Sequence, residues 1–121
     1  MTDTLTPPLF FTMPDGARIA HRLTPPKDRN APTVVFLPGY MSDMGGSKAT
    51  MLQQAAKAAG IGALLLDYSG CGLSSGDFAD GTLTRWRDEV LTLIEARVSG
   101  PVVLVGSSMG GWLMLMVAQA L

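Results

Sequence analysis

The sequence predicts an α/β protein with a mostly parallel sheet and helices on both of its faces. Three short runs, at residues 33–37, 62–67 and 102–106, are apolar throughout instead of alternating with polar residues. Continuous apolar runs are typical of parallel strands that helices cover on both sides. Longer segments with helical apolar spacing separate these runs. We therefore expect a doubly wound α/β arrangement in a single domain over residues 1–121.

The chain is expected to begin with an antiparallel hairpin over residues 9–23. Two short apolar runs flank Pro14, Asp15 and Gly16 there. Proline fixes φ and glycine accepts positive φ, so this triplet predicts a tight turn.

Two amphipathic helices are predicted between the parallel strands, and a third follows the last of them. The first, within residues 47–60, ends at Gly60, and the second begins after Thr82 as N-cap. The third, from about Gly110, is apolar almost all round, which predicts that it is buried together with Trp112. Because this helix has no stop signal, the chain resembles a domain that is truncated after it.

Composition excludes several classes of function. The formal net charge is -1, whereas nucleic-acid-binding domains are usually basic. A single cysteine, Cys71, allows no internal disulfide, and one histidine with one cysteine offers no metal site. The N-terminus lacks a secretory pattern and the apolar tail is too short to span a bilayer. We expect a cytoplasmic protein with no membrane span, no metal and no cofactor.

The motif with the clearest chemistry is Gly106-Ser107-Ser108-Met109-Gly110, which is G-x-S-x-G. A buried strand enters this motif and an apolar helix follows it. A sharp strand-to-helix turn lifts a serine oxygen above the sheet, where it can act as a nucleophile. Ser108 is therefore the predicted nucleophile. A second G-x-S-x-G, centred on Ser74, follows a glycine-rich turn and has no helix directly after it, so we do not expect Ser74 to react.

Backbone donors for a developing oxyanion are predicted beside Ser108. One is the N–H of Met109, which opens the helix after the nucleophile. The other is the N–H of Tyr40, because Gly39 and Tyr40 follow the first parallel strand, where hydrolases of this type place that donor.

These motifs resemble the α/β-hydrolase superfamily. The stretches PGYMSDMGGSKA, LDYSGCGLSSG, TLTRWRDEVL and GPVVLVGSSMGGWLM are similar to the branch that includes a mitochondrial palmitoyl-protein thioesterase and acyl-glucuronide esterase. The resemblance implies hydrolysis of a carboxylic ester or thioester through an acyl-serine intermediate. It also implies that the acid and the histidine follow the serine in the chain, hence beyond Leu121, and that 121 residues form only the N-terminal portion of the domain.

The chain offers poor internal substitutes for that acid and base. The order His21, Asp67, Ser108 occurs in serine hydrolases of another fold. We expect instead that His21 is exposed on an early strand and that Asp67 accepts hydrogen bonds from its own turn. Without a base, the chain alone is expected to be inactive.

Two alternatives stay open from sequence. A nucleotide-binding domain is suggested by Gly70, Gly72 and Gly76, although the last glycine is one residue late for a dinucleotide motif. A non-catalytic hydrolase-fold module is the other. The strand at 102–106 is expected at an unpaired sheet edge, which predicts self-association.

Overall fold

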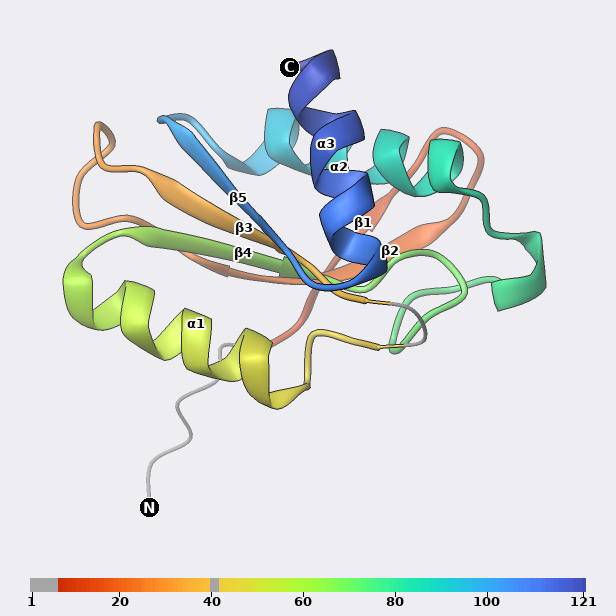
Figure 1. Ribbon diagram of the computed structural model, residues 1–121, viewed down its shortest axis with the longest axis horizontal. Coiled ribbons are helices and arrows are strands. Elements are labelled where there is room, and N and C mark those ends of the chain that lie inside the picture. Colours follow the sequence, from red (N-terminus) through yellow and green to blue (C-terminus); the bar gives the residue numbers. More distant parts are fainter. Residues whose placement is uncertain (1–6, 40–41) are drawn as a thin grey trace.

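The computed structural model describes residues 7–39 and 42–121, which form a five-stranded sheet in the order β1-β2-β4-β3-β5 (Figure 1). The strands are β1 (Leu9–Thr12), β2 (Arg18–Thr24), β3 (Thr33–Leu37), β4 (Gly62–Leu66) and β5 (Val102–Gly106). The helices are α1 (Ser47–Ala59), α2 (Leu83–Arg97) and α3 (Met109–Ala120), with a short 3-10 helix at Phe78–Asp80. The predicted element order is confirmed, and only the 3-10 turn was not expected.

The sheet joins an antiparallel part to a parallel part. β1, β2 and β4 pair antiparallel, whereas β4, β3 and β5 run parallel. The carboxyl ends of β3, β4 and β5 therefore lie at the same end of the sheet, and the loops that follow them are neighbours there. Ser108 follows β5 at this end of the sheet.

Helices cover both faces of the sheet, as predicted (Figure 1). α2 and α3 pack on the face that Val35, Leu64 and Leu66 line, and α1 packs on the face of Phe36 and Leu65. Successive residues of β3 and β4 point to opposite faces of the sheet, and helices bury both faces. This explains why the two strands are apolar throughout.

The residues predicted to begin and end the helices do so in the structure. The hydroxyl oxygen of Thr82 accepts from the N–H of Arg85, 3.0 Å away, and caps α2. Gly60 ends α1 with φ 79°, a conformation that favours glycine. No helix within the two described ranges is long and apolar enough to cross a membrane.

The predicted burial of α3 is wrong for one side of this helix. Leu113 and Val117 are buried, but Trp112 is 61% and Leu115 57% exposed. α3 contacts β5, β3 and α2, so one of its faces is packed. The opposite face has no neighbour among the described residues.

Candidate active site

Ser108 occupies a strained turn between β5 and α3. Its φ is 57° and its ψ is -118°, and it is the only non-glycine residue with positive φ in the described part of the chain. A side chain in this conformation costs about 1–3 kcal/mol, and such strain is concentrated at functional sites. The residue is exposed at the top of the sheet. The turn is the geometry that the sequence predicted for a nucleophile.

Backbone packing holds this turn in place. The N–H of Ser107 donates to the carbonyl of Leu37 at 3.2 Å, and the N–H of Gly110 donates back to the carbonyl of Ser107 at 2.9 Å. A Cβ on Gly110 would overlap the Leu37 carbonyl oxygen, and one on Gly106 would overlap the backbone of Gly110. The small residues of the motif are therefore required because α3 touches both the end of β3 and the end of β5.

Of the two predicted oxyanion donors, Met109 is described by the structure and Tyr40 is not. Met109 is the first residue of α3, so its N–H has no carbonyl one turn earlier in the helix to bond with. Gly39 lies against the turn, since a Cβ on it would be 3.0 Å from the Ser107 carbonyl oxygen and 3.2 Å from Ser108 Cβ. Tyr40 lies outside the described residues. The loop that precedes it nevertheless reaches the serine.

Lys48 adds a cation beside the turn. Its Nζ donates to Ser107 Oγ at 3.1 Å, which links the start of α1 to the residue before Ser108. A cavity of about 230 Å³ opens here, lined by Gly39, Ser107 and Lys48 together with Asp43. The sequence analysis did not single out Lys48. Lys48 could have been found from its position, because it is the second residue of the helix that follows the loop at Gly39. That loop lies at the same end of the sheet as Ser108.

Asp67 holds two loops together through its carboxylate. Its carboxylate accepts from the N–H of Met44 at 2.7 Å and of Leu73 at 2.9 Å. A Cβ on Gly72 would overlap this carboxylate. Burial raises the pKa of Asp67, although both N–H bonds oppose the shift. The predicted structural role is confirmed, and the carboxylate braces the loop that leads to α1.

His21 is buried, so the expectation that it is exposed is wrong. Its Nδ1 bonds the Ile19 carbonyl at 3.1 Å and its Nε2 accepts from Arg97 Nε at 3.2 Å. Burial lowers the pKa of His21, and the Arg97 cation lowers it further. β2 lies three strands from β5, about 14 Å at roughly 4.8 Å per spacing. His21 cannot serve Ser108 as a base.

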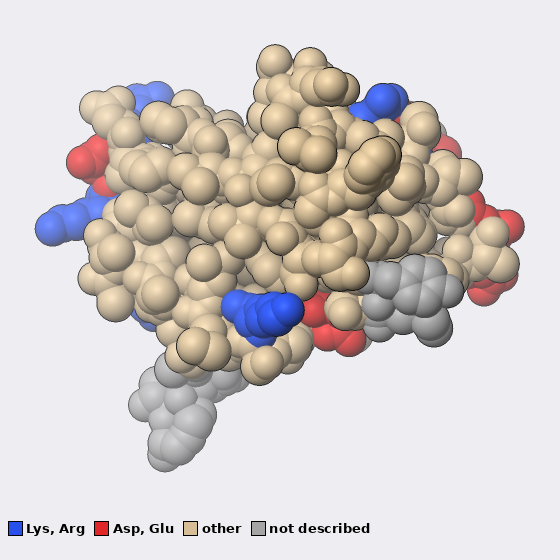
Figure 2. All heavy atoms as spheres, viewed as in Figure 1, with Lys and Arg blue, Asp and Glu red and all other residues tan. Residues whose placement is uncertain are grey.

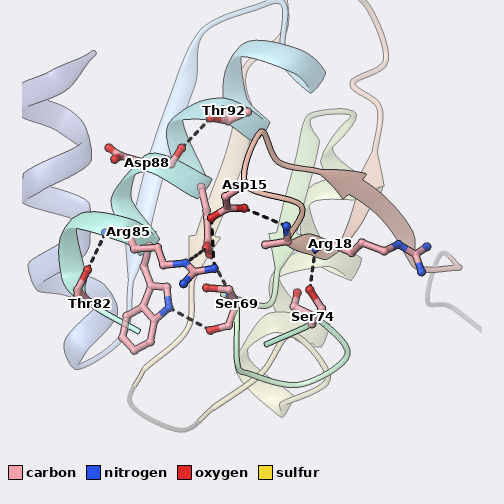
Figure 3. Close-up of polar contacts among 12 residues, drawn as sticks. Asp15, Arg18, Ser69, Ser74, Thr82, Arg85, Asp88 and Thr92 are labelled. Atoms are coloured by element: carbon pink, nitrogen blue, oxygen red, sulfur yellow. Dashed lines mark hydrogen bonds and ion pairs between the residues drawn. The ribbon is translucent and has the colours of Figure 1, made fainter. Parts of the chain in front are cut away.

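The loop after β4 is fastened to both β2 and α2 (Figure 3). Ser74 Oγ accepts from the Ala20 N–H at 2.8 Å and donates to the Asp67 carbonyl at 2.6 Å. The indole N–H of Trp86 donates to the Ser69 carbonyl at 3.1 Å. Ser74 is thus fully engaged in structure, which agrees with its dismissal as a nucleophile.

The features of a nucleotide site are absent from this same loop. Gly72 lies against the buried Asp67 carboxylate, which would repel a phosphate, whereas Gly70 lies against the backbone of Asp77 and Phe78. Burial also raises the pKa of Cys71, which keeps this thiol protonated and weakly nucleophilic. Within the described ranges, no group of three or more metal-ligating side chains occurs.

The chain belongs to the alpha/beta hydrolase family, because the pattern that defines the family matches residues 34–121. It is 41% identical over 111 residues to the human protein named palmitoyl-protein thioesterase ABHD10, mitochondrial. That alignment covers 92% of this chain and 35% of the human protein. The mouse protein of the same name is 45% identical over 89 residues, which is 74% of this chain and 30% of the mouse protein. The chain thus spans about a third of the length of these curated relatives.

Solved structures confirm the α/β-hydrolase fold. A protein from Agrobacterium vitis S4, described as a hydrolase, superposes with a TM-score of 0.88 at 39% identity. The match covers 96% of this chain and 46% of that one. Mouse alpha/beta hydrolase domain-containing protein 10 superposes with a TM-score of 0.87 at 36% identity, over 95% of this chain and 45% of its own.

The cytoplasmic location expected from the sequence is contradicted by these relatives, which are named as mitochondrial. The expectation depended on the single cysteine, on the lack of a secretory pattern and on an apolar tail too short to span a bilayer. A reduced thiol does not distinguish the cytosol from other compartments that keep thiols reduced.

Proposed function

We propose that Ser108 is the nucleophile of a hydrolase that cleaves carboxylic esters or thioesters. The observation that carries this proposal is the left-handed turn at Ser108, exposed between β5 and α3 and fixed by backbone contacts. Strain at an exposed serine has no benefit for stability, whereas it aims the hydroxyl away from the sheet. Membership in the alpha/beta hydrolase family supports the same chemistry.

In the proposed reaction, Ser108 Oγ attacks the substrate carbonyl carbon while a base takes the hydroxyl proton. The N–H groups of Met109 and Tyr40 stabilise the negative oxygen of the tetrahedral intermediate. The carbon–oxygen or carbon–sulfur bond then breaks, and the departing alcohol or thiol receives the proton from the base. A water molecule, activated by the same base, releases the carboxylic acid and restores Ser108.

The names of the curated relatives support a narrower substrate class. Palmitoyl-protein thioesterases cleave a long-chain acyl group from sulfur, so an acyl thioester is the proposed substrate of the whole protein. The same names support a mitochondrial location.

The test is covalent labelling with a fluorophosphonate, in which Ser108 Oγ forms a bond to phosphorus and fluoride departs. We expect a saturable adduct on the peptide that contains Ser108, located by mass spectrometry. The Ser108→Ala variant should lose it. Labelling is expected to be slow in the 121-residue chain, because its single histidine does not reach Ser108.

Ser74→Ala is the matched control, since Ser74 centres the second G-x-S-x-G and is bonded within its loop. This variant should keep the Ser108 adduct. Labelling of Ser74 and Ser108 at the same rate would contradict the proposed nucleophile.

A non-catalytic interaction module is the second candidate. It is favoured by one observation, the engagement of the single histidine with Ile19 and Arg97 far from Ser108. The two functions differ in one result, because only the hydrolase requires a reactive Ser108.

A further inference from the structure

Lys48 is held beside the candidate nucleophile by a contact that the proposed reaction does not use. Its Nζ donates to Ser107 Oγ at 3.1 Å. Ser107 immediately precedes Ser108, and the Cα atoms of neighbouring residues are about 3.8 Å apart. Adding the bonds of the two serine side chains places the ammonium group within about 12 Å of Ser108 Oγ. The contact therefore keeps a positive charge close to the candidate nucleophile.

Ser107 is a firm anchor for this charge because contacts on both sides fix its backbone. Its N–H donates to the Leu37 carbonyl at 3.2 Å, and its carbonyl accepts from the Gly110 N–H at 2.9 Å. A Cβ on Gly39 would be 3.0 Å from the same carbonyl oxygen. The side chain of Ser107 therefore starts from a fixed position, and it binds Lys48 at one side of the turn.

Direct contact with an acidic group does not neutralise the charge of Lys48. Among the residues that the structure describes, Lys48 takes part in no ion pair. Asp43 lines the same cavity of about 230 Å³, and its Oδ1 accepts from the N–H of Gly45 at 2.8 Å. This carboxylate weakens the field of Lys48 but does not cancel it, because the two side chains are not paired.

The surroundings of Lys48 are apolar on the side of β5. An open groove of about 500 Å³ is lined by Lys48, Gly106 and Ser107 together with five apolar side chains, those of Phe36, Met51, Leu52, Ala55 and Val105. No Asp, Glu, Lys or Arg occurs between Val98 and Leu121. Figure 2 shows a broad uncharged area over α3 and β5, with a basic group at its margin over the start of α1. The segment that contains Ser108 therefore depends on other parts of the chain for any charge at the turn.

A positive charge near Ser108 favours the transition state of the proposed reaction over its ground state. The serine is neutral before it attacks, and the carbonyl oxygen of the substrate becomes negative as the new bond forms. The N–H of Met109 is the proposed hydrogen-bond donor to that oxygen. Lys48 would add to this stabilisation through its electric field, without a contact to the substrate.

We propose that Lys48 is a positioning residue of the candidate active site: Ser107 holds its ammonium group where the positive charge stabilises the oxyanion formed when Ser108 attacks. This inference rests on the proposed hydrolase function. It assigns Ser107 a role as well, since the hydroxyl of this residue fixes the place of the charge.

The test is the rate of fluorophosphonate labelling of the purified chain. In this step the bond between Ser108 Oγ and phosphorus forms, fluoride departs and the hydroxyl proton passes to water, while the phosphoryl oxygen gains negative charge. Lys48→Met removes the positive charge and should slow labelling about three- to tenfold at low ionic strength, as expected for one charge about 10 Å away near a protein surface. Lys48→Arg keeps the charge and should restore the parent rate.

Salt separates an effect of charge from an effect of structure. The Debye length falls from about 10 Å at 0.1 M salt to about 3 Å at 1 M. The difference in labelling rate between the parent and Lys48→Met should therefore disappear at 1 M salt. The urea midpoints of the two proteins should agree at both salt concentrations, because the Lys48 side chain is exposed.

Three further variants follow the effect through the site. Lys57→Met makes the same change in the last turn of α1 and should leave the labelling rate unchanged. Asp43→Asn removes the opposing charge, keeps an oxygen for the N–H of Gly45 and should accelerate labelling. Ser107→Ala removes the anchor, so Lys48→Met should slow labelling less in this background than in the parent.

The outcomes distinguish this inference from the function on which it rests. Equal labelling of Ser108 in the parent and in Lys48→Met would overturn the role of Lys48 and leave the hydrolase function intact. Equally slow labelling in Lys48→Met and Lys48→Arg would also overturn it, because the charge would then have no effect. A folded parent chain with no adduct on Ser108 would overturn the hydrolase function, and this inference with it.

Discussion

At the scale of single residues, Gly110 and Gly111 make different contacts although they are adjacent. A Cβ on Gly110 would overlap the carbonyl oxygen of Leu37, whereas the nearest atom to a Cβ on Gly111 would be 3.9 Å away. The first glycine lets α3 touch the end of β3. The second is not required for packing.

We predict that Gly110→Ala lowers the free energy of unfolding by about 1–3 kcal/mol, because an inserted methyl group must displace backbone atoms. Gly111→Ala is the control, and it should be neutral or stabilising by up to about 1 kcal/mol, since alanine favours a helix. Urea unfolding followed by circular dichroism measures both. Equal midpoints for the two variants would contradict the packing argument.

Individual residues were predictable where a local rule determines them. The sharp turn at Ser108 was predictable from a strand, a G-x-S-x-G motif and a helix that follow one another in the sequence. The hydrogen bonding of Asp67 within its loop was predictable from its position before a tight turn. The burial of His21 was not predictable, because it depends on Arg97, 76 residues later in the chain. Likewise, the exposure of Trp112 depends on which element lies next to α3, and no local pattern contains that information.

At the scale of elements, the bond between His21 and Arg97 joins β2 to the end of α2. His21 Nδ1 donates to the Ile19 carbonyl, which leaves Nε2 as the acceptor for Arg97 Nε at 3.2 Å. Protonation of Nε2 would replace this bond with two facing cations. Burial and Arg97 both lower the pKa of His21 from its ordinary value of 6.5.

We predict that acidification below about pH 6.5 weakens this junction. In that range the unfolded chain binds a proton at His21 and the folded chain does not, so the free energy of unfolding falls as pH decreases. The measurement is the unfolding free energy of the parent and of His21→Leu between pH 8 and pH 5. The difference between the two should shrink on acidification.

The comparison with His21→Leu is necessary because two other buried groups act in the opposite direction. Burial raises the pKa of Asp67 and of Glu89, so the folded chain retains their protons more readily than the unfolded chain. Both groups are present in parent and variant, and their effect cancels in the difference. A difference independent of pH would show that His21 does not titrate as proposed.

Elements were predictable from sequence to within a residue or two. β4 ends at Leu66, one residue before the predicted end, and α3 begins at Met109, one residue before Gly110. The rules of capping and apolar spacing act over a few residues, so they define where each helix and strand lies. They do not define the order β1-β2-β4-β3-β5, because it depends on pairing between strands that are far apart in the sequence.

At the scale of the whole molecule, β5 is the last strand on one side of the sheet, and no strand among the described residues pairs with its outer edge. β5 itself has no charged residue, and Val103, its second residue, is 46% exposed. An unpaired edge of this kind is a template for another strand, including the β5 of a second chain.

We therefore predict that the purified 121-residue chain self-associates and that Val103→Lys weakens this association. In a two-fold dimer the lysine of each copy would approach its counterpart across the paired edges, so the dissociation constant should rise about tenfold or more. Size-exclusion chromatography with light scattering over a range of concentrations measures the change. Leu73→Lys adds the same charge at another exposed leucine and should leave the association unchanged. A parent chain that stays monomeric at every concentration would contradict the prediction, since it would mean that the backbone groups of β5 are satisfied without a partner strand.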